Sequence, residues 1–343
     1  MELARRRIGR TDLEVTVYGC GGAPLGNMYA PLADGEARAL LDGAWDAGFR
    51  FFDTAPLYGF GLSERRMGDA LRARPRGDYV LSSKVGCLLA PDARPNARSG
   101  DFIDALPFRP VYDYSYDAVM RSYEDTLQRL GTDRVDMLFI HDIGAMTHGA
   151  DAHPALFETA MTGGYRALDE LRRAGDVKAI GLGVNEWQVC EEAMDRGRFD
   201  VFLLAGRYTL LEQRALDSFV PRCVREGVSI VVGGAFNSGI LATGPVAGAR
   251  YDYRPAPPEI LARVAGIEAV CKAHGVPLAA AALQFPLTHP AVACVIPGMA
   301  RRPEIEANAA LIETTIPPAL WTDLKAAGLL RQDAPTPSSS PSP

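Results

Sequence analysis

The sequence predicts an α/β protein of the (β/α)8 barrel class, and two observations carry this prediction. The first is a regular alternation, in which eight short and almost continuously apolar segments are separated by helical patterns. Such segments are typical of strands buried on both faces of a parallel sheet, and eight of them close a barrel that side chains fill. The strands are expected at residues 15–20, 49–53, 79–84, 137–141, 179–184, 201–204, 229–233 and 294–297.

The second observation is that the fingerprint of the competing fold, a doubly wound open sheet, is missing. That fold places Gly-x-Gly-x-x-Gly between its first strand and the helix that follows. Here the first strand runs into residues 19–24, GCGGAP, so that proline stands where the third glycine is needed. This sequence therefore favours the barrel.

Helices are expected between the strands. Ser63 is expected to be an N-cap with Glu64 in the first turn of its helix, and Gly131 is a natural residue to end the next helix. The expected helices cover residues 34–47, 63–71, 117–130, 164–174, 186–195, 212–226, 259–274, 277–287, 303–312 and 318–329.

Three segments fall outside the alternation of strands and helices. Residues 3–15 are predicted to form a β-hairpin that turns near residues 9–12. Residues 85–117, rich in proline, aspartate and aromatic residues, are predicted to form a long loop after the third strand. Residues 1–331 are expected to be a single barrel domain, and residues 332–343 a disordered tail rich in proline and serine.

The composition narrows the class of protein. Lys and Arg number 36 against 42 Asp and Glu, a net charge of -6 with no long basic block, which speaks against nucleic acid and membrane surfaces as partners. The N-terminus lacks the apolar core of a signal peptide. The six cysteines are scattered without metal-ligand spacing, so we expect free thiols, a cytoplasmic location and no metal site. The oligomeric state stays open.

Four ionisable residues stand at the ends of three consecutive predicted strands: Asp53, Tyr58, Lys84 and His141. The active site of such a barrel lies at the carboxyl ends of its strands. Each residue taken alone has an ordinary explanation, namely a turn, loop packing, a salt bridge or a core histidine. Their convergence on one rim favours catalysis.

The four side chains form a consistent acid–base set. A tyrosine hydroxyl has an ordinary pKa of about 10, and a neighbouring ammonium lowers it. Lys84 can supply that charge, Asp53 can hold Lys84, and His141 can orient a substrate carbonyl. Tyr58 is then the general acid or base.

These motifs resemble the aldo-keto reductase family. Residues 53–59 with 63–64 (DTAPLYG, SE), 82–86 (SSKVG) and 136–141 (DMLFIH) match its motifs in order and spacing, and the similarity runs from about residue 7 to 311. The resemblance implies a barrel that binds NAD or NADP across its mouth, with Asp53, Tyr58, Lys84 and His141 as the catalytic tetrad.

The resemblance also implies the cofactor-binding residues. Asn185 matches the asparagine that holds the carboxamide, although Val184 replaces the preceding serine, and Gly233 stands where an aromatic side chain usually stacks on nicotinamide. Gly298 and Glu304 replace basic residues near the adenosine phosphate, which favours NAD, while Arg301 and Arg302 leave NADP open. The full expected set is Asn185, Gly233, Gly234, Phe236, Ser238, Gly239, Gly298, Arg301, Arg302, Glu304 and Asn308.

Three further segments, residues 106–115, 203–211 and 236–239, resemble the branch of D-threo-aldose (L-fucose) 1-dehydrogenases and pyridoxal 4-dehydrogenases. This resemblance implies a small-molecule substrate, with a sugar hemiacetal oxidised at C1 to a lactone, and we expect Phe108 and Arg207 to bind it. The aromatic residues of the long loop either cover the substrate or anchor the loop. The alternatives are a pyridoxal dehydrogenase, a general aldehyde or ketone reductase, a Schiff-base lyase using Lys84, and a cofactor-binding regulatory subunit without enzymatic activity.

Overall fold

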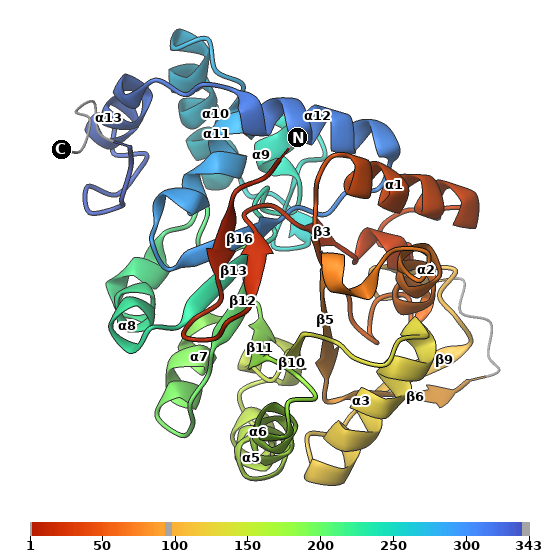
Figure 1. The fold of residues 1–343 in the computed structure, drawn as a ribbon. Helices are drawn as coiled ribbons and strands as arrows, with labels where there is room; N and C mark the ends of the chain where they lie inside the picture. Colours follow the sequence, from red (N-terminus) through yellow and green to blue (C-terminus); the bar gives the residue numbers. More distant parts are fainter. Residues whose placement is uncertain (1, 93–97, 338–343) are drawn as a thin grey trace.

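The computed structural model describes residues 2–92 and 98–337, and its centre is an eight-stranded parallel barrel (Figure 1). The ring closes between its two end strands, because Tyr18 bridges Val295 and Gly21 bridges Gly298. The barrel strands are β3 (Cys20–Gly21), β4 (Phe51–Asp53), β5 (Val80–Val85), β10 (Met137–His141), β11 (Ala179–Val184), β12 (Val201–Ala205), β13 (Ser229–Gly233) and β16 (Val292–Ile296). The predicted fold class is confirmed.

The first predicted strand is wrong in its bounds. Residues 14–16 belong to β2 (Glu14–Thr16), which pairs with β1 (Arg5–Arg7) in an antiparallel hairpin, and the barrel strand β3 is short. Between them, residues 17–19 exchange backbone hydrogen bonds with Val295 of β16. One apolar run therefore serves two sheets, and its pattern cannot show where the change occurs.

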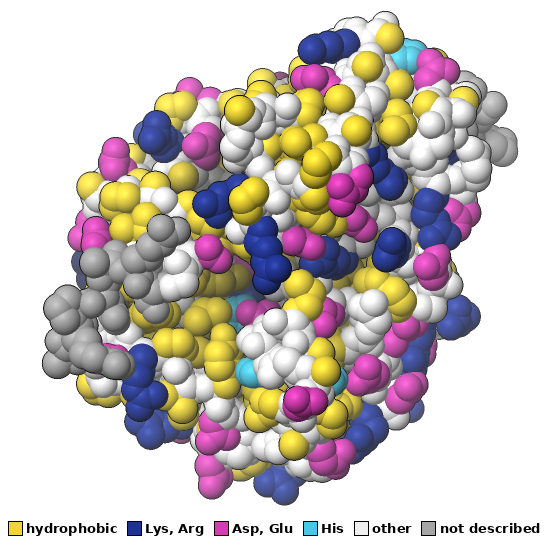
Figure 2. All heavy atoms as spheres, turned by 180° about the vertical axis from the view of Figure 1, so that it is seen from behind, with side chains coloured by type: hydrophobic (Ala, Val, Ile, Leu, Met, Phe, Trp, Pro, Cys, Tyr) yellow, Lys and Arg dark blue, Asp and Glu magenta, His cyan; other side chains and the backbone are white. Residues whose placement is uncertain are grey.

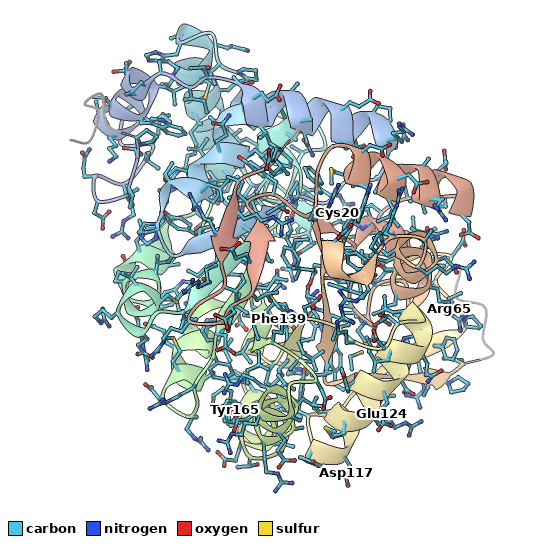
Figure 3. All side chains as sticks on the ribbon, viewed as in Figure 1. Cys20, Arg65, Asp117, Glu124, Phe139 and Tyr165 are labelled. Atoms are coloured by element: carbon cyan, nitrogen blue, oxygen red, sulfur yellow. The ribbon has the colours of Figure 1, made fainter. Side chains whose placement is uncertain are left out.

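The predicted N-terminal hairpin covers the amino-terminal end of the barrel. Its residues Ile8, Leu13 and Val15 are buried and join the side chains that fill the barrel interior. The interior is apolar and dense, and Figure 3 shows Phe139 of β10 near its middle, with Glu124 and Arg65 on the outer helices. The hairpin stands in front of the barrel in Figure 1, so the opposite end is the face where the strands terminate.

The helices surround the barrel with small shifts from the predicted bounds. The predicted helix at 212–226 is interrupted, because Ser218 (φ -150°, ψ -50°) departs from helical backbone between η4 (Arg214–Asp217) and α8 (Phe219–Glu226). The other long helices are α1 (Asp34–Asp46), α2 (Leu62–Leu71), α3 (Tyr116–Leu130), α6 (Tyr165–Ala174), α7 (Trp187–Met194), α10 (Pro258–Ala273), α11 (Leu278–Gln284), α12 (Arg302–Glu313) and α13 (Pro318–Ala326).

Several short elements between the barrel strands were not predicted from the sequence. Two helices, α4 (Ala145–His148) and α5 (His153–Thr159), precede a π-helical turn at 160–164, and α9 (Ile240–Thr243) precedes a small hairpin, β14 (Arg250–Tyr251) with β15 (Arg254–Pro255). The elements η1 (Pro24–Gly26), η2 (Arg76–Asp78) and η5 (Phe285–Thr288) are single 3-10 turns.

Ser63 is not the N-cap of α2, as the sequence predicted. Gly61 occupies that position with φ +93°, and Ser63 lies inside the helix, fully buried. Its hydroxyl donates to the carbonyl of Gly22 (2.7 Å) and contacts the Thr54 hydroxyl (2.8 Å). Ser63 therefore ties α2 to the loops beside the barrel mouth, which is a more buried role than capping.

The long segment after β5 has its own secondary structure. β6 (Cys87–Pro91) pairs with β9 (Phe108–Tyr112), and β7 (Arg98–Ser99) pairs with β8 (Phe102–Ile103). Residues 93–97 lie outside the described residues. The predicted long loop at 85–117 therefore carries two small hairpins, which the sequence did not indicate because cross-strand pairing between distant residues leaves little local pattern.

The ordered chain reaches beyond residue 331, where the sequence predicted disorder to begin. Ala334 is 1% exposed, and the carbonyls of Ala334 and Pro335 accept hydrogen bonds from Lys325 and Thr288 (both 2.7 Å). These contacts fix residues 332–335 against α13 and η5. The rest of the predicted tail, residues 338–343, lies outside the described residues.

The six cysteines are buried and carry free thiols. Across residues 2–92 and 98–337, no group of three or more His, Cys, Asp or Glu side chains is placed to hold a metal ion. In the same residues, no helix combines the length and apolar character that crossing a bilayer requires.

Candidate active site

The structure brings the four predicted catalytic side chains together at the carboxyl ends of β4, β5 and β10. The Lys84 ammonium donates to Asp53 Oδ2 (2.7 Å) and to the Tyr58 hydroxyl (3.1 Å). The Tyr58 ring stands nearly perpendicular to the His141 ring, at a centroid distance of 5.8 Å. The strand register produces this arrangement, since Asp53 pairs with Ser82 and Lys84 pairs with Phe139, two residues before His141.

Two glycines position Tyr58. A Cβ atom on Gly26 would lie 2.4 Å from the carbonyl carbon of Tyr58, and one on Gly59 (φ +63°) would lie 2.5 Å from the Gly26 oxygen. The backbone therefore approaches more closely here than any side chain permits. This contact fixes the turn that carries Tyr58 over the barrel mouth.

Asp53 and Lys84 form a buried ion pair, 2% and 1% exposed. Asp53 also accepts a hydrogen bond from the Ser82 hydroxyl (2.6 Å), and Lys84 also donates to the carbonyl of Thr54 (2.9 Å). Burial by itself lowers the pKa of Lys84, but the charges of Asp53 and Tyr58 outweigh burial and raise it. Lys84 is therefore held as an ammonium, which is unsuited to forming a Schiff base.

The pKa of Tyr58 is raised, because burial of its hydroxyl outweighs the opposing charge of Lys84. Lys84 acts in the predicted direction, yet the net shift differs from the expected lowering. The ammonium nevertheless lies where it stabilises a phenolate more than a phenol.

His141 is neutral at physiological pH. Burial lowers the pKa of its imidazole well below the usual value, and the Lys84 charge adds to this shift. The buried Tyr114 hydroxyl fixes the strand end by donating to the carbonyl of His141 (2.8 Å), and it also lies 2.8 Å from His148 Nε2. Nδ1 of His141 is buried without a hydrogen-bond partner among the described residues.

Asp142, directly after His141, is a site residue that sequence reasoning missed. Its Oδ2 lies 3.5 Å from His141 Nε2, and its Oδ1 accepts a long hydrogen bond from Asn185 (3.4 Å). Burial raises its pKa to about 6. The only signal in the sequence was its place next to the histidine at a strand end.

A small hairpin crosses the same end of the barrel. The Tyr253 hydroxyl at its tip donates to Asn185 Oδ1 (3.1 Å), and the Tyr253 amide donates to the Ser238 hydroxyl (3.0 Å). Both Asp252 (φ +47°) and Tyr253 (φ +63°) have left-handed backbone, which forms the tight turn of this hairpin. Tyr253 therefore links the predicted cofactor residues Asn185 and Ser238.

Arg207 holds this hairpin. Its guanidinium donates to the Asn185 carbonyl (2.7 Å), pairs with Asp252 (3.0 Å) and contacts the sulfur of Met146 (3.7 Å). The charge of Arg207 is paired with Asp252 within the chain, and its predicted role in substrate binding stays a prediction.

Comparisons with known proteins identify the family of this chain. The model of the Aldo/keto reductase family matches residues 18–328. The chain belongs to this family. A pyridoxal 4-dehydrogenase from Microbacterium luteolum is 46% identical over 95% of this chain and 98% of its own length. A D-threo-aldose 1-dehydrogenase from a Pseudomonas species is 38% identical over 93% and 95% of the two chains.

A solved structure of an aldo-keto reductase supports the same family. The holo form of an aldo-keto reductase from Bacillus halodurans matches with a TM-score of 0.70 at 26% identity, covering 96% of this chain and 97% of that one. The chain is therefore an oxidoreductase that uses a nicotinamide cofactor. This finding excludes the lyase and leaves the regulatory subunit without support.

The predicted pyrophosphate segment of this aldo-keto reductase fits a dinucleotide. The amides of Phe236 and Ser238 have no acceptor among the described residues, so they are free to bind phosphate oxygens. A Cβ atom on Gly233 would meet no atom closer than 3.4 Å, and one on Gly239 would meet none within 4 Å. Gly234 has φ +58°, and the Phe236 side chain packs against the outer core.

The predicted adenosine segment lies beside it, because Gly233 of β13 pairs with Ile296 of β16, two residues before Gly298. Glu304 in the first turn of α12 accepts a hydrogen bond from the Ala300 amide (2.8 Å). Arg301 is exposed, Arg302 lies 3.8 Å from Glu306, and Asn308 is 6% exposed. The two predicted cofactor segments therefore form one continuous rim.

The aromatic residues of the long segment divide between the two predicted roles. The Phe102 ring lies 6.2 Å from the Tyr58 ring and borders the site, whereas Tyr114 is fully buried and anchors His141. Tyr112 packs edge-on against His148 (4.9 Å). Phe108 lies at the outer end of β9, two residues after Leu106, whose amide bonds the Gly59 carbonyl.

Figure 2 shows the face opposite the N-terminal hairpin, with a hollow near its middle bordered by hydrophobic side chains. A substrate approaching from this face meets apolar walls and a few polar groups at their base. This arrangement is typical of sites for small molecules.

Proposed function

We propose that this aldo-keto reductase is an NAD-dependent dehydrogenase that oxidises the hemiacetal carbon of a small hydroxylated ring to a lactone. The observation that carries this proposal is the contact of Lys84 with both Asp53 and Tyr58 beside a neutral His141. This set can accept a proton from a substrate hydroxyl.

Each side chain of this set has its own role in the reaction. The neutral imidazole of His141 hydrogen-bonds the oxygen of the reacting carbon and orients it. The Tyr58 oxygen takes the hydroxyl proton, and the Lys84 ammonium at 3.1 Å stabilises the resulting charge. The bound nicotinamide supplies the acceptor for the hydride that leaves the same carbon. The carbon loses one hydride and its oxygen loses one proton, which leaves the carbonyl of a lactone.

The substrate class follows from the two relatives. Pyridoxal and D-threo-aldoses differ in size and aromaticity, but both close into cyclic hemiacetals in water. The higher identity to the pyridoxal 4-dehydrogenase (46% against 38%) places pyridoxal beside L-fucose as a first substrate to test. The sequence alone favoured the aldose.

Preference for NAD is proposed from the end of the site that would receive adenosine. Glu304 carries a negative charge in the first turn of α12, where it repels a 2′-phosphate and can accept a hydrogen bond from a ribose hydroxyl. The ratio of kcat/KM for NAD to that for NADP measures this preference. A kcat/KM for NADP about tenfold or more above that for NAD would reject the preference.

The function is tested by absorbance at 340 nm with NAD and a panel of pyridoxal, L-fucose, D-arabinose, L-xylose and D-glucose. Reduction of NAD with pyridoxal or L-fucose, together with a lactone product, is the expected result. Silence with all five, combined with reduction of simple aldehydes by NADH, would replace the proposal with a general aldehyde reductase.

A further inference from the structure

The carboxylate of Asp142 has acceptor capacity that the protein leaves unused. A carboxylate offers about four acceptor positions. Among the described residues, only the Asn185 amide donates to it, at the long distance of 3.4 Å, and the His141 ring stands 3.5 Å away. Asp53 in the same mouth accepts from Lys84 and Ser82 at 2.7 and 2.6 Å. A buried carboxylate without short hydrogen bonds is costly to the folded state.

The backbone holds Asp142 in this costly position. Its φ of +49° is rare for a residue other than glycine, and its amide donates to the Gly183 carbonyl (2.9 Å) of the neighbouring strand. The side chain keeps 15% exposure, so it is accessible from the mouth. The strain and the unused acceptors point to a ligand that donates hydrogen bonds.

The spacing between His141 and Asp142 matches two oxygens on neighbouring carbons. Such oxygens lie about one hydrogen-bond length apart, and His141 Nε2 and Asp142 Oδ2 are separated by 3.5 Å. The imidazole can therefore bond the oxygen on the reacting carbon while the carboxylate accepts from the next hydroxyl. Aldoses carry a hydroxyl at that neighbouring carbon, whereas the ring carbon next to the aldehyde of pyridoxal carries none.

We propose that Asp142 binds the substrate hydroxyl next to the reacting carbon and thereby selects hydroxylated substrates. This inference deepens the proposed function and rests on the same site. Asp142 transfers no proton in the reaction; it is a specificity residue that accepts one charge-assisted hydrogen bond. The competing explanation is that Asp142 only orients the Asn185 amide for the cofactor.

The test compares lactaldehyde with propanal as substrates for reduction by NADH, because the two differ only in the neighbouring hydroxyl. Asp142→Asn suits the experiment, since asparagine tolerates left-handed backbone. The matched control is Glu186→Gln, which removes a carboxylate that bonds the Met146 amide at 3.0 Å beside the same site.

Asp142→Asn should lower kcat/KM for lactaldehyde by about tenfold or more through KM, as expected for loss of a bond to a charged acceptor. Activity with propanal and the KM for NADH should change by less than about twofold. The control Glu186→Gln should change kcat/KM for neither aldehyde. An equal loss with the two aldehydes, a raised KM for NADH, or no loss at all would overturn the inference.

Reduction of open-chain aldehydes does not require hemiacetal oxidation. An enzyme that reduces lactaldehyde but oxidises neither pyridoxal nor L-fucose would reject the proposed function and would still decide the role of Asp142.

Discussion

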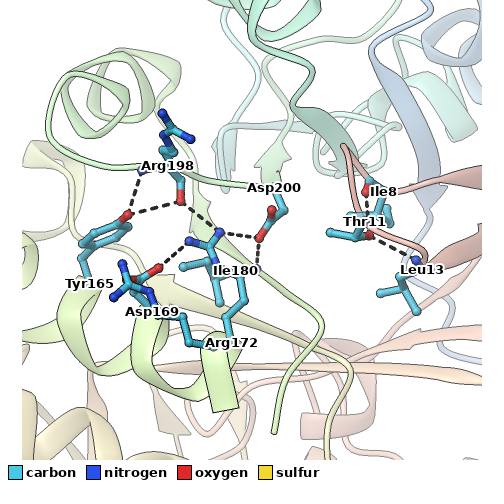
Figure 4. A network of polar contacts seen from close by, with 10 residues as sticks. Ile8, Thr11, Leu13, Tyr165, Asp169, Arg172, Ile180, Arg198 and Asp200 are labelled. Carbon is cyan, nitrogen blue, oxygen red and sulfur yellow. Dashed lines mark hydrogen bonds and ion pairs between the residues drawn. The ribbon is translucent and has the colours of Figure 1, made fainter. Parts of the chain in front are cut away.

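Asp142 at the carboxyl end of the barrel differs in its hydrogen bonds from two aspartates at the amino-terminal end. At the amino-terminal end, Asp200 precedes β12 and accepts from the Ile180 amide (3.0 Å) and Arg172 (2.8 Å), and Arg172 also bonds Asp169 (2.5 Å), as Figure 4 shows. Asp136 precedes β10 and in the same way accepts hydrogen bonds from the Leu81 amide (2.9 Å) and Arg76 (2.7 Å). At the carboxyl end, the Asp142 carboxylate accepts no hydrogen bond shorter than 3.4 Å from the described residues.

The difference separates groups that stabilise the fold from groups available for ligands. A buried polar group whose hydrogen bonds are satisfied within the chain contributes to the folded state, whereas one left without partners costs stability and retains binding capacity. In a barrel, the amino-terminal face is the expected place for the first kind and the carboxyl face for the second. The predictions that follow use substitutions at each end.

The largest effect is expected from Tyr58→Phe. Loss of the hydroxyl removes proton transfer at the carboxyl face, so turnover should fall by about 10²–10⁴-fold. Cofactor binding, measured by quenching of protein fluorescence, and the melting temperature should change little. Turnover within about threefold of the unchanged enzyme would remove Tyr58 from the mechanism.

Gly26→Ala should damage both stability and turnover. The new Cβ would lie 2.4 Å from the Tyr58 carbonyl carbon, so Tyr58 must move, at a cost of about 1–3 kcal/mol. Gly35→Ala in α1 is the control, since its Cβ would meet no atom within 4 Å. The free energy of unfolding in urea and kcat should both fall for Gly26→Ala. For Gly35→Ala both should stay unchanged or rise. Normal kcat in Gly26→Ala would show that the close contact does not position Tyr58.

Asp→Asn substitutions at the two ends should change stability with opposite signs. Asp200→Asn loses the ion pair with Arg172 and should lower the free energy of unfolding by about 1–3 kcal/mol at pH 7.5, with near-normal turnover. Asp142→Asn should raise it at the same pH, because the buried charge disappears. Urea unfolding of both variants measures this contrast, and a destabilised Asp142→Asn would break it.

The pH dependence of the Asp142 effect has a definite sign. Its pKa in the folded chain is about 6 against an ordinary 3.8, so the folded state holds the proton more tightly than the unfolded state. The free energy of unfolding therefore falls as pH rises from about 4 to above 6. The gain of Asp142→Asn, up to about 3 kcal/mol for a shift of this size, should vanish at pH 4. The charged and titratable groups around Asp142 are Lys84, His141, Glu186, Tyr58, Tyr112, Tyr114, Tyr253 and Cys87.

The smallest effect is expected at the hairpin. Tyr253→Phe removes one hydrogen bond to Asn185 (3.1 Å) at an exposed position, so the KM for NAD should rise by about two- to fivefold. Tyr116→Phe removes a comparable bond to Glu170 (2.6 Å) on the outside of the barrel and should leave kinetics unchanged. An equal effect of the two variants on the KM for NAD would show that the hairpin does not contribute to cofactor binding.

The sequence allowed the barrel and the convergence of the four candidate catalytic residues to be predicted, because both leave local patterns. Strands buried on both faces are continuous apolar runs, and residues at the ends of adjacent parallel strands meet on one rim. The strands at 137–141, 179–184 and 229–233 have the predicted bounds. The remaining parts of the site depend on contacts between distant residues.

Arg207 illustrates why those parts could not be predicted. Its charge is neutralised by Asp252, 45 residues away, on a hairpin that no periodic pattern announces. Asp142 was adjacent to a predicted catalytic residue, yet its importance comes from the bonds it lacks. A missing hydrogen bond is a property of three-dimensional packing and leaves no trace in sequence.

The most direct test of the proposed function follows the hydride itself. Pyridoxal or L-fucose carrying deuterium on the reacting carbon is oxidised with NAD, and the NADH formed is analysed by mass spectrometry for the enzyme and for Tyr58→Phe. One deuterium in each NADH, a slower rate than with unlabelled substrate, and almost no product from the variant are the predicted results. NADH without deuterium, or equal labelling and rate in the variant, would contradict hydride transfer from that carbon with Tyr58 as the proton acceptor.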